Sequence, residues 1–200
     1  MPQIYNNAVM TNAGAKLLTR AQANEIRIEF TRIAVGNGTY SSGEKTKASL
    51  QTRTALKALK NSYALSDVDV YSDHSVKVTA LITNQDPVTG KTLVDNGYFI
   101  NEMGLFAKPA GASSSEEVLY SITTVAGETG DFMPPYNGYN PAQITQDYFA
   151  TVNNSADVTI NTAGAALLAA DANKLRDDAT KQKCKIGIEN GLIYVQEVDE

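Results

Sequence analysis

The segment that comes nearest to a chemical motif is VGNGTYSSGEKT, at residues 35–46. A phosphate-binding P-loop reads G-x-x-x-x-G-K-[ST], with the lysine directly after the second glycine. Gly38 and Gly43 have the required separation, but Glu44 occupies the lysine position and Lys45 is displaced by one residue. Because a carboxylate repels a polyphosphate, we predict a glycine-rich surface turn after a strand rather than a nucleotide site.

Residue types suited to nucleophilic, acid–base or zinc chemistry are few. The chain has one histidine, His74, and one cysteine, Cys184. Neither has a second histidine or cysteine at ligand spacing, and the G-x-S-x-G elbow of many Ser–His–Asp sites does not occur in the sequence. Adjacent carboxylates at 116–117 and 177–178 are poorly placed to share a proton, because sequence neighbours on a helix do not face each other. We predict no catalytic residue, no cofactor and no metal, and therefore no enzyme.

An acidic run comes closest to a calcium site, because it places three carboxylates near one another: Asp67, Asp69 and Asp73. In a calcium loop of the EF-hand type, the third acidic position and the glycine would fall at Tyr71 and Ser72. The mismatch favours a solvent-facing strand edge.

Composition suits one sizeable domain with an appendage. The chain has 200 residues, of which 42% are hydrophobic, with ten tyrosines and no tryptophan. Residues 1–60 carry a net charge of +6 and residues 61–200 a net charge of −11. The basic residues are scattered and have few aromatic neighbours, so we expect docking to an acidic protein, or to the chain's own acidic half, rather than to nucleic acid.

Targeting and membrane signals are weak. The first residues, MPQIYNNAV, lack the basic and apolar regions of a signal peptide. The longest apolar run, AGAALLAA at residues 163–170, is far shorter than the roughly 20 residues of a membrane span. We expect a soluble protein made in the cytosol, with no membrane insertion.

The N-terminal part predicts a helix followed by a strand. Thr11 is a suitable N-cap for a helix to about Asn24, whose apolar face would use four side chains: Ala15, Leu17, Leu18 and Ala21. The alternation in IRIEF, residues 26–30, predicts a strand, and a slip of phase before Ile33 predicts a bulge at residues 31–32. Residues 47–60 are expected to be partly helical.

Further strands follow from alternation and turn residues. We expect two strands joined by a turn at residues 72–75, the second burying one face: Val76, Val78, Ala80 and Ile82. Three more are expected at residues 98–107, 118–125 and 147–160. The predicted fold is α+β and mainly β, with an antiparallel, sandwich-like core and an N-terminal helix in a domain covering residues 1–160.

Beyond residue 160 the character of the sequence changes. Residues 161–183 predict a helical stem, with small or apolar residues at coiled-coil spacing: Ala165, Leu168, Ala172, Leu175, Ala179, and then Gln182. A trimeric coiled coil and an amphipathic helix lying on its own domain explain this pattern equally well. Residues 184–200 predict a β-hairpin, because Asn190-Gly191 suits a type I′ turn.

Several segments, taken in order, resemble the N-terminal region of phage tail-collar and tail-fibre proteins. That family has a T-x-x-G helix start, an f-T-x-i-x-v-G-x-G-x-y segment, an E-[IM]-G-L-[YF]-A strand and an aspartate-aromatic-x-P-P segment. The matching residues here are Thr11 and Gly14; Phe30, Thr31, Ile33, Val35, Gly36, Gly38 and Tyr40; Glu102, Met103, Gly104, Leu105, Phe106 and Ala107; and Asp131, Phe132, Pro134 and Pro135. Together they cover roughly residues 10–160.

The resemblance implies a baseplate-proximal domain of a contractile phage tail or a phage-tail-like particle. It implies a homotrimer, attachment to a baseplate wedge protein, and assembly into the virion tail within the bacterial cytoplasm. In such a domain Gly36 and Gly38 would turn the chain through positive φ, and Tyr40 would cover the strand end. A buried Glu102 would need a partner, for which we consider Arg27, Arg32 or backbone amides, and we expect its role to be structural.

Fibre proteins of this kind usually continue into a long shaft, whereas this sequence extends about forty residues past the collar-like part. We therefore expect an adaptor between baseplate and fibre, whose stem and hairpin hold a separate distal fibre or receptor-binding chain. The alternative is a short receptor-binding protein that recognises cell-surface glycan through three tyrosines expected to be exposed: Tyr136, Tyr139 and Tyr148. A cell-wall hydrolase is a third hypothesis, disfavoured because no catalytic constellation is visible.

Overall fold

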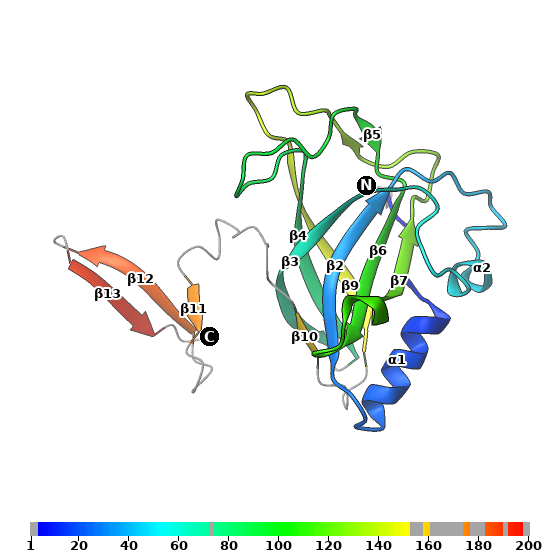
Figure 1. Cartoon of the computed structure of the whole chain (residues 1–200), viewed down its shortest axis with the longest axis horizontal. Coiled ribbons are helices and arrows are strands. Elements are labelled where there is room, and N and C mark those ends of the chain that lie inside the picture. The colour runs from blue at the N-terminus through cyan, green and yellow to red at the C-terminus, as the bar shows by residue number, and fades with distance from the viewer. Residues whose placement is uncertain are drawn as a thin grey trace. The chain divides into compact units, whose positions relative to one another are not determined.

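The computed structural model describes residues 4–72, 74–152, 158–160, 174–176, 183–189 and 192–197. The chain divides into two compact units, residues 1–166 (unit 1) and 167–200 (unit 2) (Figure 1). Among the described residues of both units, β-strands predominate over helices, which confirms the predicted mainly β class with few helices.

Unit 1 is built around one eight-stranded sheet in the order β1-β7-β6-β2-β3-β4-β9, with β10 pairing with β2. Its strands are β1 (Val9–Met10), β2 (Ile28–Gly36), β3 (Leu59–Ser72), β4 (Ser75–Thr83), β6 (Glu102–Pro109), β7 (Val118–Thr124), β9 (Gln143–Thr151) and β10 (Val158–Ile160). The pairings are antiparallel except that of β10 with β2. The short strands β5 (Tyr98–Phe99) and β8 (Phe132–Met133) form a separate pair.

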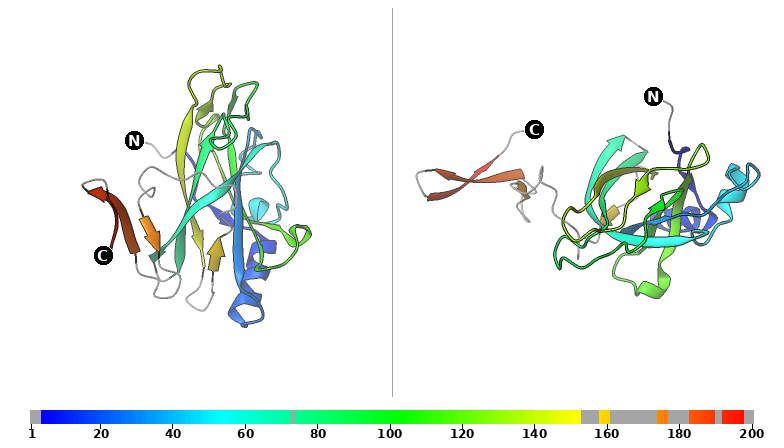
Figure 2. Two further views of the ribbon diagram at one scale, coloured as in Figure 1. Left: turned by 60° about the vertical axis from the view of Figure 1, so that its left-hand side comes forward. Right: turned by 90° about the horizontal axis from the view of Figure 1, so that it is seen from above.

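The sheet curls so that strands far apart in its order come together (Figure 2, right). Four strands separate β7 from β9, yet Ser121 Oγ on β7 donates to Tyr148 Oη on β9 at 3.0 Å. Beside it, Tyr120 Oη donates to the carbonyl oxygen of Thr151 at 2.6 Å. The antiparallel core is as predicted, but its two layers are opposite sides of one curled sheet, because these side chains draw the two ends together.

The main core fills the inside of the curl. The inward face of β4 is buried as the alternation predicted: Val76, Val78, Ala80 and Ile82. Phe30 and Tyr120 pack edge to face, with ring centroids 5.1 Å apart. The register of β2 against β6 shifts between Phe30 and Arg32, which confirms the predicted bulge.

A smaller apolar cluster covers the other face of β2 and β6. Its buried members are Ala34, Tyr40, Leu50, Leu56, Phe106, Leu119 and Ile122. Helix α2 (Lys47–Gln51) brings Leu50 to this cluster, and it is the helical part of the segment expected to be partly helical. Strand β6 is therefore buried on both faces, which explains its nearly continuous apolar sequence.

Helix α1 (Asn12–Gln22) forms where the sequence predicted a helix. Thr11 Oγ1 accepts from the Gly14 amide at 3.0 Å, so Thr11 is the N-cap. Leu17 and Ala21 are buried in the main core, whereas Ala15, which we expected on the same face, is exposed. The helix packs mainly against β7 at one end of the sheet (Figure 1).

The residues of unit 2 that the structure describes form three antiparallel strands in the order β11 (Lys174–Arg176), β12 (Lys183–Glu189) and β13 (Leu192–Glu197). Strands β12 and β13 pair over residues 184–197, the region of the predicted hairpin, while the turn residues 190–191 lie outside the described residues.

The predicted helical stem is wrong at residues 174–176, which form β11. Leu175 pairs with Cys184 in the sheet, because backbone pairing with β12 overrides the local helix propensity. The remaining residues of the expected seam lie outside the described residues: Ala165, Leu168, Ala172, Ala179 and Gln182.

Candidate functional site

Two of the motif segments and the residues just before β3 meet at one buried carboxylate. Glu102, the first residue of β6, is 0% exposed. Its Oε1 atom accepts from the amides of Gly38 at 3.1 Å and Ala58 at 2.7 Å. Its Oε2 atom accepts from the Lys57 amide at 2.8 Å and from Tyr40 Oη at 2.5 Å. We call Glu102 and these four donor residues the Glu102 cage.

The cage shows which of the expected partners bind the Glu102 carboxylate. Three backbone amides and the Tyr40 phenol donate to it, and neither Arg27 nor Arg32 is among these donors. Glu102 pairs with Gly36 in the sheet, whereas Arg27 precedes the other end of β2. Arg32 instead pairs with Glu117, with Nη2 and Oε2 2.7 Å apart.

The chemistry of the cage is structural rather than catalytic. Each oxygen of Glu102 accepts two hydrogen bonds and the side chain has no exposed surface, so a substrate has no access to it. A buried carboxylate held by several donors fixes the position of the backbone that supplies them. The cage thus ties the connection between β2 and β3 to the start of β6.

The motif glycines provide room, not unusual backbone angles. We expected Gly36 and Gly38 to adopt positive φ, but among the described glycines only three do: Gly90, Gly111 and Gly138. A Cβ on Gly38 would lie 2.5 Å from Glu102 Oε1. A Cβ on Gly36 would lie 2.5 Å from both this atom and the Ala58 carbonyl oxygen. Both positions therefore need glycine for a steric reason, because the Glu102 carboxylate occupies the space that a larger side chain would fill.

Tyr40, which we expected to cover the strand end, donates to Glu102 and is itself covered by charged side chains. Burial, and then the hydrogen bond to Glu102, raises the pKa of the Tyr40 phenol above its ordinary value, so it remains a donor. Arg53 Cζ and Lys57 Nζ lie 5.2 and 5.3 Å from the centroid of its ring.

Glu44, the residue that breaks the P-loop pattern, binds both of these cations. Its Oε1 lies 2.7 Å from Lys57 Nζ and 3.3 Å from Arg53 Nη2. Hydrogen bonds from Lys57 and Ser41 lower the pKa of Glu44 to about 2. Lys45, the displaced lysine, donates to the Gly127 carbonyl oxygen at 2.7 Å. These lysine and arginine side chains are engaged by the chain's own oxygens, so the segment has the character of a closed surface loop.

The other motif residues lie away from the cage. Leu105 belongs to the main core, and a Cβ on Gly104 would lie 2.6 Å from Leu119 Cδ1, so this position also needs a small residue. The Pro134 carbonyl oxygen accepts from Asn84 Nδ2 at 3.1 Å, and Pro135 lies against Gly97. The double proline therefore holds the chain just after β8 against the connection between β4 and β5.

The remaining chemical candidates do not assemble into a site. His74 is exposed beside the turn between β3 and β4. Asp69 pairs with Lys77 at 3.2 Å, and Asp73 lies outside the described residues. Within the described ranges, no cluster of three or more histidine, cysteine or acidic residues could hold a metal ion.

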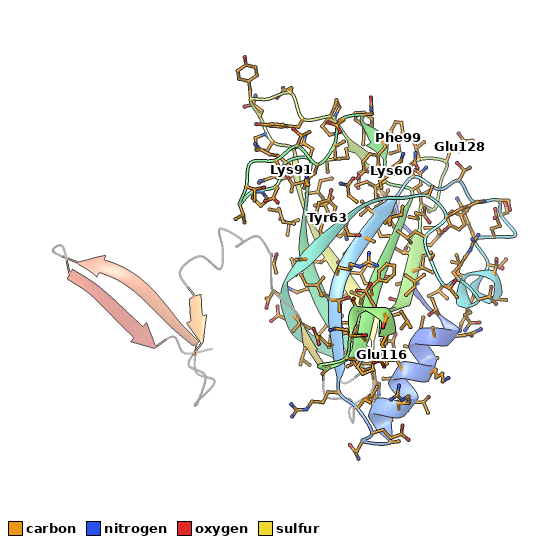
Figure 3. The ribbon with its side chains drawn as sticks, in the orientation of Figure 1. Lys60, Tyr63, Lys91, Phe99, Glu116 and Glu128 are labelled. Carbon is orange, nitrogen blue, oxygen red and sulfur yellow. The ribbon has the colours of Figure 1, made fainter. Side chains whose placement is uncertain are left out.

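Sequence reasoning missed two exposed aromatic pairs. Phe99 and Phe132 have ring centroids 5.1 Å apart and are 44% and 51% exposed. Tyr71 and Phe149 are 4.7 Å apart and lie on β3 and β9. The exposure of Phe149 could have been predicted from the alternation of β9, because Phe149 lies between the inward-facing residues Tyr148 and Ala150. In Figure 3, Phe99 lies in the upper part of unit 1 and Glu116 in its lower half.

Of the three tyrosines expected to be exposed for glycan recognition, one is not exposed. Tyr148 is buried, because it points into the curl toward Ser121. Tyr136 is half-buried and accepts from Gln85 Nε2 at 2.9 Å. Tyr139 is 86% exposed.

No protein-family model, curated protein or solved structure matches this chain. Its likeness to tail-collar proteins therefore rests on the four motif segments. In the part of the chain that the structure describes, helices of the length and apolar character needed to cross a bilayer are absent.

Proposed function

We propose that this chain is a structural component of a phage tail or phage-tail-like particle. It acts as a homotrimeric base that joins the baseplate to a fibre or receptor-binding protein. The observation that carries the proposal is the Glu102 cage, in which residues of separate tail-collar motifs serve one buried structural purpose. A protein that transmits force between a baseplate and a fibre needs a rigid body, and the cage supports such a body by fixing the connection between β2 and β3 to β6.

The surface of unit 1 suits assembly. The tilted pair Phe99 and Phe132 presents apolar area to solvent, and large exposed aromatic side chains are typical of protein–protein contacts. Assignment to the virion tail, with a baseplate wedge protein on one side and a distal fibre or receptor-binding protein on the other, follows from the resemblance.

The first experiment measures the mass of the purified chain at micromolar concentration by light scattering or sedimentation. A trimer is expected, with three times the monomer mass of 21.4 kDa. A low-resolution map of the assembled particle should then place this mass between baseplate and fibre. A monomer that stays monomeric with the wedge protein present would contradict the proposal.

A second candidate function is direct recognition of host glycan. It is favoured by Tyr139, whose exposed ring lies in the loop between β8 and β9. Purified protein should then bind host cells, and Tyr139→Ala should weaken binding at least roughly five-fold if its ring stacks on a sugar. Tyr71→Ala, at another exposed tyrosine, is the matched control. Equal loss in both variants, or no cell binding, would count against this function.

A further inference from the structure

Strand β9 has one backbone edge that pairs with no other strand in the described part of the chain. On its other side, it pairs with β4 along all nine residues. The hydrogen bonds at both ends of this pairing involve even-numbered residues: Ala142 accepts from Asn84, and Val152 donates to His74. Because successive residues of a strand direct their N–H and C=O groups to opposite sides, the odd-numbered residues face away from β4.

Side-chain contacts agree with this assignment. The carbonyl oxygen of Thr151 accepts from Tyr120 on β7, and that of Asp147 accepts from the Gln146 side chain. Both carbonyls belong to odd-numbered residues, and neither acceptor contact is a backbone ladder bond. The N–H groups of Asp147 and Phe149 are therefore directed toward the same open edge.

Beside this edge is a groove of about 430 Å³. Residues 146–149 form one wall, and the N-terminal residues 4–8 form another. The second wall is held to the opposite end of the sheet, since the Asn6 amide donates to the Thr124 carbonyl oxygen at 2.9 Å. The groove thus lies between the two ends of the curled sheet, where an added strand would continue the ladder of β9.

The outer face next to the edge is acidic with an aromatic neighbour. Three carboxylates surround Lys77: Asp67, Asp69 and Asp147. A hydrogen bond to Asp69 and attraction to all three raise the pKa of Lys77. Among these four described side chains, the carboxylates outnumber the cation three to one. Phe149 pairs with Lys77 in the register and is 46% exposed. The surface therefore favours a partner that brings positive charge and an apolar side chain.

We propose that the open edge of β9 docks an extended segment of a different protein, which adds to the sheet as a strand. That segment carries a basic residue beside Asp147 and an apolar residue beside Phe149. A second copy fits less well, because antiparallel pairing of two full-length β9 strands places Asp147 opposite Asp147. This inference stands on the edge and its charges, and does not depend on the tail assignment.

The test uses a capped nine-residue peptide with lysine at its centre, leucine two positions to either side and threonine elsewhere. Its symmetry allows either strand direction. The matched control peptide has glutamate at the centre. Fluorescence anisotropy with the full chain should show the lysine peptide binding about five-fold more tightly, the effect of one or two exposed charge pairs.

Charge reversal on the protein should invert this preference. Asp147→Lys should favour the glutamate peptide, and Asp147→Asn, which keeps an oxygen acceptor for Thr79, should abolish discrimination. Glu116→Lys makes the same change in net charge on the turn η1 (Ser114–Glu116), which packs against β6, and should leave the preference unaltered. An unchanged preference in Asp147→Lys would refute the assigned edge.

Strand addition is separated from simple charge attraction by methylating peptide amides. In antiparallel pairing the third and seventh amides face β9, so methyl groups there should abolish binding and methyl groups on the fourth and sixth should not. In parallel pairing these two results should be exchanged. Equal effects would overturn the proposal. So would slow amide exchange of Asp147 and Phe149 in the free monomer, because the chain would then cover its own edge. Self-association abolished by Asp147→Lys would identify a second copy as the occupant instead.

Discussion

At the residue scale, the Glu102 side chain has no exposed surface and depends on the protein for all of its hydrogen bonds. Its four donors are all fixed in place: three are backbone amides and the fourth is the buried Tyr40. Removing one partner from such a cage leaves buried hydrogen-bond donors unpaired, which lowers the free energy of unfolding strongly. This loss is larger than the net stability that the intact cage provides relative to apolar side chains in the same place.

Glu102→Gln should therefore lower the free energy of unfolding by about 3 kcal/mol, although it changes hardly any volume. The amide group of glutamine would direct N–H donors at two groups that are themselves donors. Chemical denaturation checks the value. Glu116→Gln, at an exposed glutamate, is the control and should change stability by less than about 0.5 kcal/mol. Equal stability of Glu102→Gln and the wild type would mean that the four hydrogen bonds to the carboxylate contribute no net stability.

Two glycine substitutions show whether Gly38 is needed because a side chain would clash with Glu102 or because the loop needs a flexible backbone. Gly38→Ala should destabilise the fold by about 2 kcal/mol, because its Cβ meets Glu102 Oε1 at 2.5 Å. Gly43→Ala lies in the same loop with no atom within 4 Å of its Cβ, and should be nearly neutral. Thermal denaturation of both variants gives the comparison, and similar losses in the two would point to backbone flexibility instead.

Sequence reasoning reached the need of Glu102 for a partner but not the identity of the donors. The amides of Lys57 and Ala58 belong to a segment without regular structure, whose position depends on tertiary packing. Gly36 and Gly38 were predicted to be needed for positive φ, but they are needed because the Glu102 carboxylate lies against them. Only the folded structure brings that carboxylate to these positions.

At the scale of elements, the N-cap of α1 does more than begin a helix. Thr11 Oγ1 accepts from the Gly14 amide and donates to the carbonyl oxygen of Leu119, so it also joins the helix to β7. Thr11→Ala should lower stability by about 2 kcal/mol, at the upper end for a cap. Thr46→Ala removes the exposed cap of α2 and should cost about 0.5 kcal/mol. Urea denaturation measures both, and a reversed order would be inconsistent with the Leu119 contact.

The ion pair between Arg32 on β2 and Glu117, the residue just before β7, should depend on pH. Burial alone would raise the pKa of Glu117, but hydrogen bonds from Arg32 and Thr31 hold that pKa below its ordinary value of 4.5. A lowered pKa in the folded state means stabilisation that is present above the ordinary value and lost as the pH falls through the folded value.

The difference in unfolding free energy between the wild type and Glu117→Gln should therefore be largest near pH 7. It should shrink as the pH falls below about 4.5, toward and through the lowered folded pKa. Denaturation at several pH values measures it. A difference that grows on acidification would show that the sign is wrong.

Periodicity predicted the elements where one face alone is buried. The alternation of β4 and the N-cap of α1 were visible because each depends on local sequence. Leu175 was misassigned because its strand exists only through pairing with β12, a contact that local propensity does not encode. The curl was likewise not predictable, since Ser121 and Tyr148 meet across the whole sheet.

At the scale of the whole molecule, the division into two units predicts separable stability. Residues 1–166 contain the curled sheet, α1, α2 and the β10 strand that pairs with β2. A chain ending at residue 166 should retain a cooperative thermal transition within about 3 °C of the full-length value, the shift that ~1 kcal/mol produces at this size. Circular dichroism at matched concentration and oligomeric state tests this. Loss of the cooperative transition would show that unit 2 is required for folding.

The contacts that draw β7 and β9 together have a mechanical consequence. Along the strands, a pulling force is opposed by ladders of backbone hydrogen bonds that must shear together. Across the junction, it is opposed by side-chain contacts such as Ser121–Tyr148, which can peel apart one after another. The body is therefore stiff in one direction and compliant in the other, and it bears load best when the tension runs parallel to its strands.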